Sequence, residues 1–159
     1  MRKLILFTDG SVNTKSKTGY GAYLAVSDLS LSIDQLKSAV KLKRFINTSS
    51  TKLELQTLIW ALSEVKMSHT NIIIYTDSQN IIGLPARRAQ LKKNNYCSIK
   101  GKRLNNHEQY QAFFTMIAGV DYELIKVRGH IPAKQKDDMD RLFTLVDRAA
   151  RVALRQQEL

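Results

Sequence analysis

The sequence predicts an α/β protein in which a mixed β-sheet is flanked by helices. Its predicted elements follow the order βββαβαβα, with strands first and crossover connections later. Two apolar runs, at residues 3–8 and 71–76, have the length of buried strands, and both lead into Thr-Asp. Between them, residues 52–67 contain no glycine or proline and carry apolar residues at helical spacing. A sheet with helices packed on it follows from these observations.

The first third of the chain is predicted to be a strand meander. Residues 3–8 form the first strand, and residues 19–26, which begin with glycines and continue with β-forming residues, return antiparallel to it. Residues 28–34 are predicted to be a turn. Residues 35–46 alternate roughly between apolar and charged side chains, which predicts a third, half-exposed strand.

The middle of the chain is predicted to be a helix followed by a parallel strand. Residues 47–51 are rich in capping side chains and precede the helix at 52–67. The strand at 71–76 then lies parallel to the first strand through a right-handed crossover. Ser78 is in position to cap a short helix that ends near residues 83–85.

The last third is predicted to hold two more helices and a strand. Residues 105–118 are helical, residues 122–127 form the fifth strand, and residues 131–138 are a charged loop. A long helix over residues 139–156 turns an apolar face inward. With 159 residues and no linker-like segment, we expect a single domain over residues 1–159.

Composition favours a nucleic-acid partner. The net charge is +11, and such an excess favours polyanions, although basic proteins that bind no nucleic acid exist. There is no apolar run near 18 residues, and the four apolar residues after Lys3 are too few for a signal-peptide core. A single cysteine, Cys97, permits no internal disulfide. We therefore expect a cytoplasmic protein without membrane association.

Positive charge is concentrated in residues 86–103. Seven basic residues fall in this window with no acid between them: Arg87, Arg88, Lys92, Lys93, Lys100, Lys102 and Arg103. A solvated surface is the ordinary interpretation of a basic run, but this excess favours an exposed arm that grips phosphates. Within it, Tyr96 is equally compatible with packing on a sugar or base and with a local core role.

The two Thr-Asp ends predict a pair of acids at one edge of the sheet. Asp9 and Asp77 follow strands that we expect to be neighbours, and adjacent carboxylates repel unless a cation lies between them. Hard oxygen ligands suit Mg²⁺ or Mn²⁺. An ordinary turn residue is the other interpretation of either aspartate, because Asp-Gly is a common turn pair. Glu54, taken alone, fits a first-turn acid that faces the helix dipole.

Taken together, the motifs resemble those of the type 1 ribonuclease H family over nearly the whole chain. The matching pieces are Thr8-Asp9-Gly10-Ser11, Gly19-Tyr20-Gly21-Ala22, Leu53-Glu54-Leu55, Thr76-Asp77-Ser78-Gln79, Val127-Arg128-Gly129-His130 and Val146-Asp147-Arg148-Ala149-Ala150. Each is weak alone, but their order and spacing together are specific. The resemblance implies the ribonuclease H-like three-layer fold, with a five-stranded mixed sheet of order 3-2-1-4-5.

The resemblance also implies a two-metal site for cleaving the RNA strand of RNA–DNA hybrids. Four carboxylates would hold two Mg²⁺ ions, with Mn²⁺ as a substitute: Asp9, Glu54, Asp77 and Asp147. Asp9 would bridge the ions, Glu54 and Asp77 would complete the nucleophile side, and Asp147 would bind the other ion. His130 resembles the family's mobile histidine, which assists proton transfer or product release; a structural histidine is the alternative.

The resemblance implies substrate contacts for three polar side chains and for the basic segment. Gln79 occupies a position that contacts the hybrid through the minor groove, and Ser50 and Thr51 occupy positions often filled by asparagine. Residues 86–103 resemble the handle that grips the DNA strand, through the seven basic residues named above. We expect the enzyme to act as a monomer.

The sequence departs from the family pattern in three places. The loop 12–17 lacks the usual Asn-Pro-Gly, and the only tryptophan, Trp60, lies outside the handle. The segment before Asp147 is longer than usual, which makes Asp140 a rival fourth ligand; the match at Val-Asp-Arg-Ala-Ala favours Asp147. Other functions considered are a non-catalytic hybrid- or double-stranded-RNA-binding module and another nuclease of the same superfamily, such as a resolvase or transposase.

Overall fold

A five-stranded sheet of order β3-β2-β1-β4-β5 is the centre of the fold, which confirms the predicted strand order. The computed structural model describes residues 2–127, 134 and 137–158. The strands are β1 (Arg2–Asn13), β2 (Thr18–Val26), β3 (Lys41–Phe45), β4 (Thr70–Thr76) and β5 (Asp121–Lys126). The helices are α1 (Ile33–Ser38), α2 (Ser50–Glu64), α3 (Gln79–Ile82), α4 (Leu84–Lys93), α5 (His107–Ile117) and α6 (Asp138–Glu158).

Strand pairing follows the predicted pattern. β2 runs antiparallel to both β1 and β3, whereas β4 runs parallel to both β1 and β5. The parallel register pairs Phe7 with Tyr75, whose rings stack with centroids 5.1 Å apart. The two Thr-Asp motifs therefore come from adjacent strands, although they continue differently.

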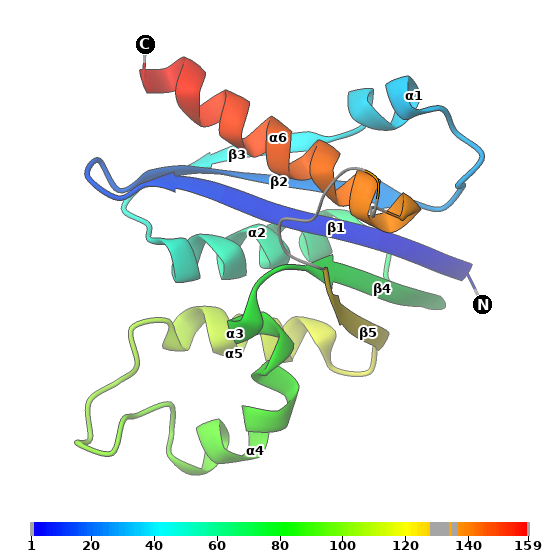
Figure 1. Cartoon of the computed structure of the whole chain (residues 1–159). Helices are drawn as coiled ribbons and strands as arrows, with labels where there is room; N and C mark the ends of the chain where they lie inside the picture. Colours follow the sequence, from blue (N-terminus) through cyan, green and yellow to red (C-terminus); the bar gives the residue numbers. More distant parts are fainter. Residues whose placement is uncertain (1, 128–133, 135–136, 159) are drawn as a thin grey trace.

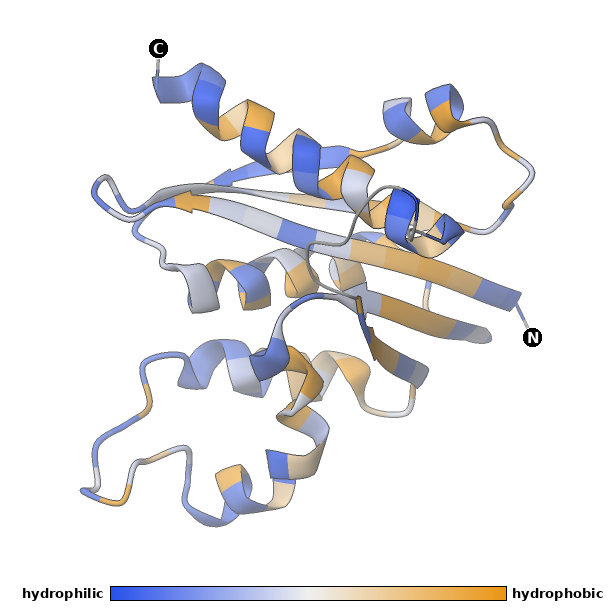
Figure 2. Ribbon diagram, viewed as in Figure 1, coloured by the Kyte–Doolittle hydropathy of each residue, from blue (hydrophilic) through white to orange (hydrophobic). Residues whose placement is uncertain are grey.

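Helices cover both faces of the sheet and make three layers (Figure 1). One face is covered by α6 and α1, and the other by α2 and α5. Side chains alternate along β1, so that Leu6 packs toward α2 and Phe7 toward α6. Because both faces are buried, the strand reads as a continuous apolar run, visible in β1 and β4 in Figure 2.

The expectation that Asp9 occupies a turn after the first strand is wrong. β1 extends through Gly10 and Ser11 to Asn13, and Asp9 pairs with Ala22 of β2. The pairing with β4 ends at Phe7, so Asp9 lies just beyond the point where β4 leaves β1. Asp77 does follow the end of its strand. The long antiparallel partner β2 explains why β1 continues where β4 stops.

The strand predicted over residues 35–46 is also wrong in its first half. Residues 33–38 form α1, and only Lys41–Phe45 belong to β3. A capping box starts the helix: the Ser32 hydroxyl accepts from the Gln35 backbone N–H at 3.2 Å, and the Gln35 side chain accepts from the Ser32 N–H at 2.9 Å. Ser-x-x-Gln is a readable sequence signal for a helix start, and it decides the conformation here.

The basic segment begins as a helix rather than as an irregular arm. α4 starts with a proline in its first turn and carries the first four basic residues, from Arg87 to Lys93. Tyr96 is buried in the core on the α2 side, which settles its role as structural. Among the described residues, no helix has both the length and the apolar content needed to cross a membrane.

Candidate active site

Asp9 and Asp147 meet between the sheet and α6. Asp9 follows Phe7 by two residues and therefore projects from the same face of β1, the face that α6 covers. Asp147 follows the fully buried Val146 on α6. The two carboxyl groups are hydrogen-bonded to one another. Asp147 also forms an ion pair with Arg151, one helical turn later, with Nε 3.2 Å from Oδ1.

A patch of glycines brings α2 close to the other face of the sheet. Gly10 and Gly21 are paired across β1 and β2, and they leave room for Leu53 and Thr57 of α2. A Cβ atom on Gly10 would lie 2.9 Å from Leu53 Cδ2, and one on Gly21 would collide with the Thr57 hydroxyl. Close approach of the helix places its first turns, and thus Glu54, beside the end of β4.

Glu54 and Asp77 form the second half of the acidic cluster. Ser78 hydrogen-bonds to the Glu54 side chain, and the charge of Asp77 acts on both Glu54 and Asp9. Ser78 is itself fixed, because its N–H donates to Thr76 Oγ1 at 3.1 Å and its hydroxyl caps α3. Asp77 is exposed to solvent, whereas Asp9 is buried. Two strands of the sheet, β1 and β4, and two helices, α2 and α6, thus bring one acid each to a single region.

Burial and the repulsion between neighbouring acids raise the pKa values of Asp9 and Glu54. Burial, the charge of Asp77 and the hydrogen bond with Asp147 raise the pKa of Asp9 to about 9, against a smaller lowering by the Gly10 N–H. Burial also raises the pKa of Glu54, and the charge of Asp77 adds to this rise, while the Ser78 hydrogen bond opposes it.

The donor set fits hard divalent cations. Four carboxylates supply only oxygen ligands, and a bound cation would offset the charge of Asp77, which adds to burial in raising the Asp9 pKa. The acids interact pairwise, from Asp147 to Asp9 to Asp77 to Glu54. Across the described part of the chain, however, no three acidic, histidine or cysteine side chains already converge as a finished metal site. Small side-chain rotations would accompany cation binding.

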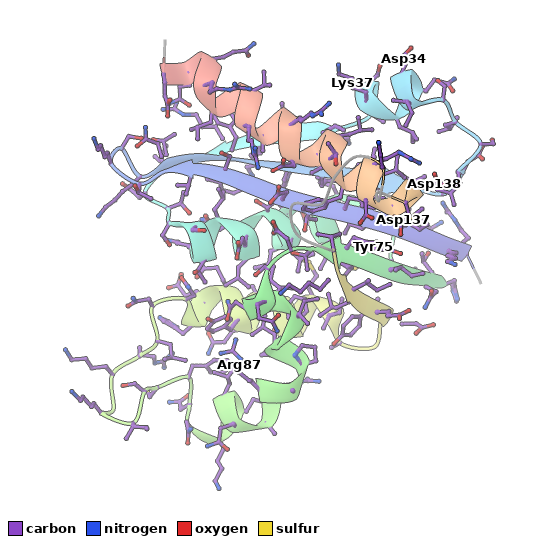
Figure 3. The ribbon with its side chains drawn as sticks, in the orientation of Figure 1. Asp34, Lys37, Tyr75, Arg87, Asp137 and Asp138 are labelled. Carbon is purple, nitrogen blue, oxygen red and sulfur yellow. The ribbon has the colours of Figure 1, made fainter. Side chains whose placement is uncertain are left out.

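Asp140, the rival fourth ligand, has a different role in this structure. It is buried near the start of α6, where its Oδ2 accepts from the Asp137 N–H at 3.1 Å. The Asp137 side chain in turn accepts from the Asp140 N–H at 2.8 Å. Asp137 directly precedes α6 and Asp138 begins it (Figure 3). This reciprocal bonding caps the helix.

The side chains predicted to contact a hybrid lie on exposed surfaces around this cluster. Ser50 and Thr51 are in the first turn of α2, after the cap residue Ser49, and Gln79 is in the first turn of α3. The Gln79 side chain accepts from Lys126 Nζ at 2.9 Å. Sequence reasoning missed Lys126 and Arg151. Arg151 was detectable as an i+4 partner of Asp147, whereas the contact between Lys126 and Gln79 joins distant segments.

The seven basic residues divide into two groups. Arg87 and Arg88 pack over the rings of Tyr110 and Phe114, each with 5.6 Å from Cζ to the ring centroid. These contacts hold α4 against α5, and Figure 3 shows Arg87 at this junction. All seven are exposed, and the remaining five lie at the end of α4 and in the loop that follows it: Lys92, Lys93, Lys100, Lys102 and Arg103. His130 lies outside the described residues.

Curated proteins that are similar in sequence to this chain are named ribonuclease H. A protein named ribonuclease H from Treponema denticola is 25% identical over 152 residues, covering 86% of this chain and 92% of its own. A protein with the same name from Moorella thermoacetica is 23% identical over 162 residues, covering 100% and 98%.

Solved structures with the same fold include viral RNase H domains. The PFV RNase H domain superimposes with a TM-score of 0.72 at 16% identity, over 93% of this chain and 92% of that domain. The prototype foamy virus protease-reverse transcriptase superimposes with a TM-score of 0.74 at 16% identity, over 93% of this chain and 20% of the viral chain. The family model for RNase H matches residues 1–151, and the chain therefore belongs to the RNase H family.

Proposed function

We propose that this chain is a single-domain endonuclease that hydrolyses the RNA strand of RNA–DNA hybrids with two Mg²⁺ ions. Membership of the RNase H family and the matching fold support the reaction class. The observation that carries the metal proposal is the clustering of buried Asp9 with Asp77 and Asp147. Burial, and then the charge of Asp77 and the hydrogen bond with Asp147, raise the pKa of Asp9 to about 9. Such a cluster beside a polyanionic substrate requires cations.

The chain would hold the ions through Asp9, Glu54, Asp77 and Asp147. Two bound divalent ions supply an activated water and stabilise charge on the leaving 3′ oxygen. Asp9 is the member that interacts with both halves of the cluster, which suits a bridging ligand. Ser78 orients Glu54 through their hydrogen bond, and Arg151 orients Asp147. His130 remains the predicted residue for proton transfer or product release.

The choice of Asp147 over Asp140 rests on their partners. Asp147 contacts Asp9, whereas Asp140 caps α6 through Asp137. If Asp140 bound a metal instead of the Asp137 N–H, the hydrogen bond that caps the start of α6 would be lost. We therefore assign Asp140 to helix stability and Asp147 to the metal site.

Hybrid recognition would use the exposed groups around the acids. Gln79, Ser50 and Thr51 border the cluster and suit contacts in the minor groove, where 2′-hydroxyls are displayed. The exposed lysines after α4 suit phosphate contacts. A monomeric, cytoplasmic enzyme is the prediction that accompanies this function.

A cleavage assay with a labelled RNA–DNA hybrid tests the proposal. We expect Mg²⁺ to support cleavage of the RNA strand, Mn²⁺ to substitute, and EDTA to abolish it. Asp9→Asn should abolish cleavage while leaving hybrid binding largely intact, because exposed cations carry most of the affinity.

Three results would contradict the proposal. Normal cutting by Asp9→Asn would remove the metal site from this cluster. Binding of the hybrid by the unmodified chain without any metal-dependent cleavage would instead indicate a non-catalytic hybrid-binding module. Cleavage of branched DNA in preference to the hybrid would favour a resolvase-like nuclease.

A further inference from the structure

Ile99 is an apolar side chain presented to solvent at the tip of the loop between α4 and α5. Its relative exposure is 106%, whereas the next most exposed large apolar side chain, among those described, is Ile46 at 62%. Ile99 belongs to neither of the two hydrophobic clusters of the chain and does not pack against them. Packing within the folded chain therefore does not explain why an isoleucine occupies this position.

The loop that carries Ile99 is held in one shape by backbone hydrogen bonds. Cys97 and Arg103 form an antiparallel bridge, and the Ser98 N–H donates to the Lys102 carbonyl at 2.6 Å. Inside this bridge, the Gly101 N–H donates to the Ser98 carbonyl at 2.9 Å, with Gly101 in the left-handed region at φ 82°. Ile99 is thus at the turn of a tight hairpin.

The base of the hairpin is anchored in the core. Tyr96 is buried, its N–H donates to the Leu91 carbonyl at 2.8 Å, and its carbonyl accepts from the Leu104 N–H at 2.9 Å. A fixed base and a bridged stem mean that the position of Ile99 relative to α4 and α5 is defined. In Figure 1 this loop extends away from the sheet.

Positive charge surrounds the apolar tip. Lys100, Lys102 and Arg103 are exposed on the same hairpin, and there is no acid anywhere in residues 86–103. An aliphatic group set among cations matches a nucleic-acid groove, where sugar edges lie between two rows of phosphates. The minor groove of an A-like duplex is wide and shallow, so a side chain on a turn reaches its floor without deforming the helix.

We propose that Ile99 is a groove-contacting residue that packs against the sugars of the bound hybrid while the flanking cations hold the phosphates. The proposal rests on the function proposed above and adds a salt-independent contact to it. A membrane surface is the other basic-plus-apolar partner, but one isoleucine buries too little apolar surface to hold a protein on a bilayer.

Equilibrium binding of a fluorescent RNA–DNA hybrid in EDTA, at several NaCl concentrations, tests this contact. We expect Ile99→Ser to raise Kd about fivefold at every salt concentration, as loss of one partly buried aliphatic contact predicts. The slope of log Kd against log salt should stay the same, because no phosphate contact is lost. Lys100→Ala should instead reduce that slope by about 0.9 if Lys100 contacts one phosphate.

Two matched variants serve as controls for Ile99→Ser. Ile99→Leu should bind within about twofold of the unmodified chain, because the aliphatic surface is kept. Ile33→Ser makes the same chemical change at another exposed isoleucine, on α1, which lies on the far side of the molecule from this loop (Figure 1), and should leave Kd unchanged. Equal far-UV circular dichroism and thermal midpoints check that every variant is folded.

The outcomes separate this proposal from the proposed function. If the unmodified chain cleaves the hybrid with Mg²⁺ but Ile99→Ser binds as tightly as Ile33→Ser, the Ile99 contact alone is wrong. Loss of affinity with a reduced salt slope also overturns it, because the change then acts through phosphate contacts. Retention of the unmodified chain, but not of Ile99→Ser, on anionic phosphatidylglycerol vesicles would assign the tip to a membrane. A chain that neither binds nor cleaves the hybrid overturns both proposals.

Discussion

Asp9 is expected to make the metal-free protein less stable as the pH rises. Its pKa in the folded state is about 9, well above the ordinary value of 3.8. The folded chain therefore holds this proton more tightly than the unfolded chain does. The stabilisation that results is complete below about pH 4 and is lost as the pH rises toward 9, because the carboxylate must ionise beside other acids.

Asp9→Asn should reverse this loss, because asparagine does not ionise. In EDTA at pH 8 we expect the variant to be more stable by about 2 kcal/mol or more, and the difference should grow between pH 4 and pH 9. Urea unfolding at pH 5, 7 and 9 measures it, with the exposed Asp121→Asn as the control. Mg²⁺ should narrow the gap by stabilising the unmodified chain. A gap that stays constant with pH would show that Asp9 is already charged in the folded protein.

Asp147 and Asp140 should respond differently to the same isosteric change. Asp147→Asn should reduce Mg²⁺-dependent cleavage by about 100-fold or more, because even the outer partners of metal ligands contribute about 10–100-fold. Asp140→Asn should keep most of the cleavage and instead lower the unfolding free energy by about 1 kcal/mol, through a weaker cap at Asp137. Single-turnover cleavage and urea unfolding of both variants measure the two effects. The opposite pattern would make Asp140 the fourth ligand.

The contact between α2 and the sheet is the element-scale feature on which the site depends. Glycine in a strand interior is usually unfavourable, so its replacement by alanine normally stabilises a sheet. Here Gly21 faces Thr57, whose hydroxyl donates to the Leu53 carbonyl at 2.7 Å and whose position is therefore fixed. The helix must move outward to accommodate a methyl group, and Glu54 moves with it.

Gly21→Ala should therefore destabilise the protein by about 1–3 kcal/mol, as overpacking does. Cleavage should fall further than the loss of folded protein explains, because Glu54 is displaced from Asp77. Gly83→Ala is the matched control, because a Cβ there meets the Gln79 and Asn80 carbonyls at ordinary distances of 3.5 and 3.9 Å, and its effect should stay within about 0.5 kcal/mol. An unchanged or raised unfolding midpoint for Gly21→Ala would show that α2 tolerates the methyl group.

For the whole molecule, most helices and strands could be predicted because their signals are local, whereas the strand order was implied by the resemblance to the ribonuclease H family. Apolar runs, capping residues and helical spacing are all readable within about 15 residues. The extension of β1 past Asp9 was not readable, because it depends on pairing with β2 at residues 18–22. The helix at 33–38 was readable from its capping box but was outweighed by the alternation around Val40 and Leu42.

The members of the acidic cluster could be named from the sequence, whereas the contacts that bring them together could not. The motifs around Asp9, Glu54, Asp77 and Asp147 singled out these residues, but their linkage depends on packing between distant segments. The packing of Arg87 and Arg88 on aromatic rings, which sets them apart from the other five basic residues, also depends on α5, which lies later in the chain. Periodicity and spacing carry no information on such pairings.

Two kinds of positive charge can hold a nucleic acid on this molecule, and they make different predictions. The excess of +11 attracts polyanions from a distance, and any single lysine contributes to it equally. Direct phosphate contacts depend instead on position. Lys93 ends α4 beside the exposed hairpin, whereas Lys37 lies in the last turn of α1, and Figure 3 shows Lys37 far from Arg87 of α4.

Lys93→Ala and Lys37→Ala change the net charge by the same amount and so isolate position. If the handle contacts phosphates, Lys93→Ala should weaken hybrid binding and reduce the slope of log Kd against log salt by about 0.9, while Lys37→Ala leaves that slope within error. Titration of a labelled hybrid in EDTA between 50 and 300 mM NaCl, roughly the range in which counterion release dominates affinity, measures both slopes. Equal reductions in the two variants would mean that overall charge, and not the segment 86–103, governs the affinity. The difference between the slopes is therefore the direct measure of a handle that grips its substrate at defined phosphates.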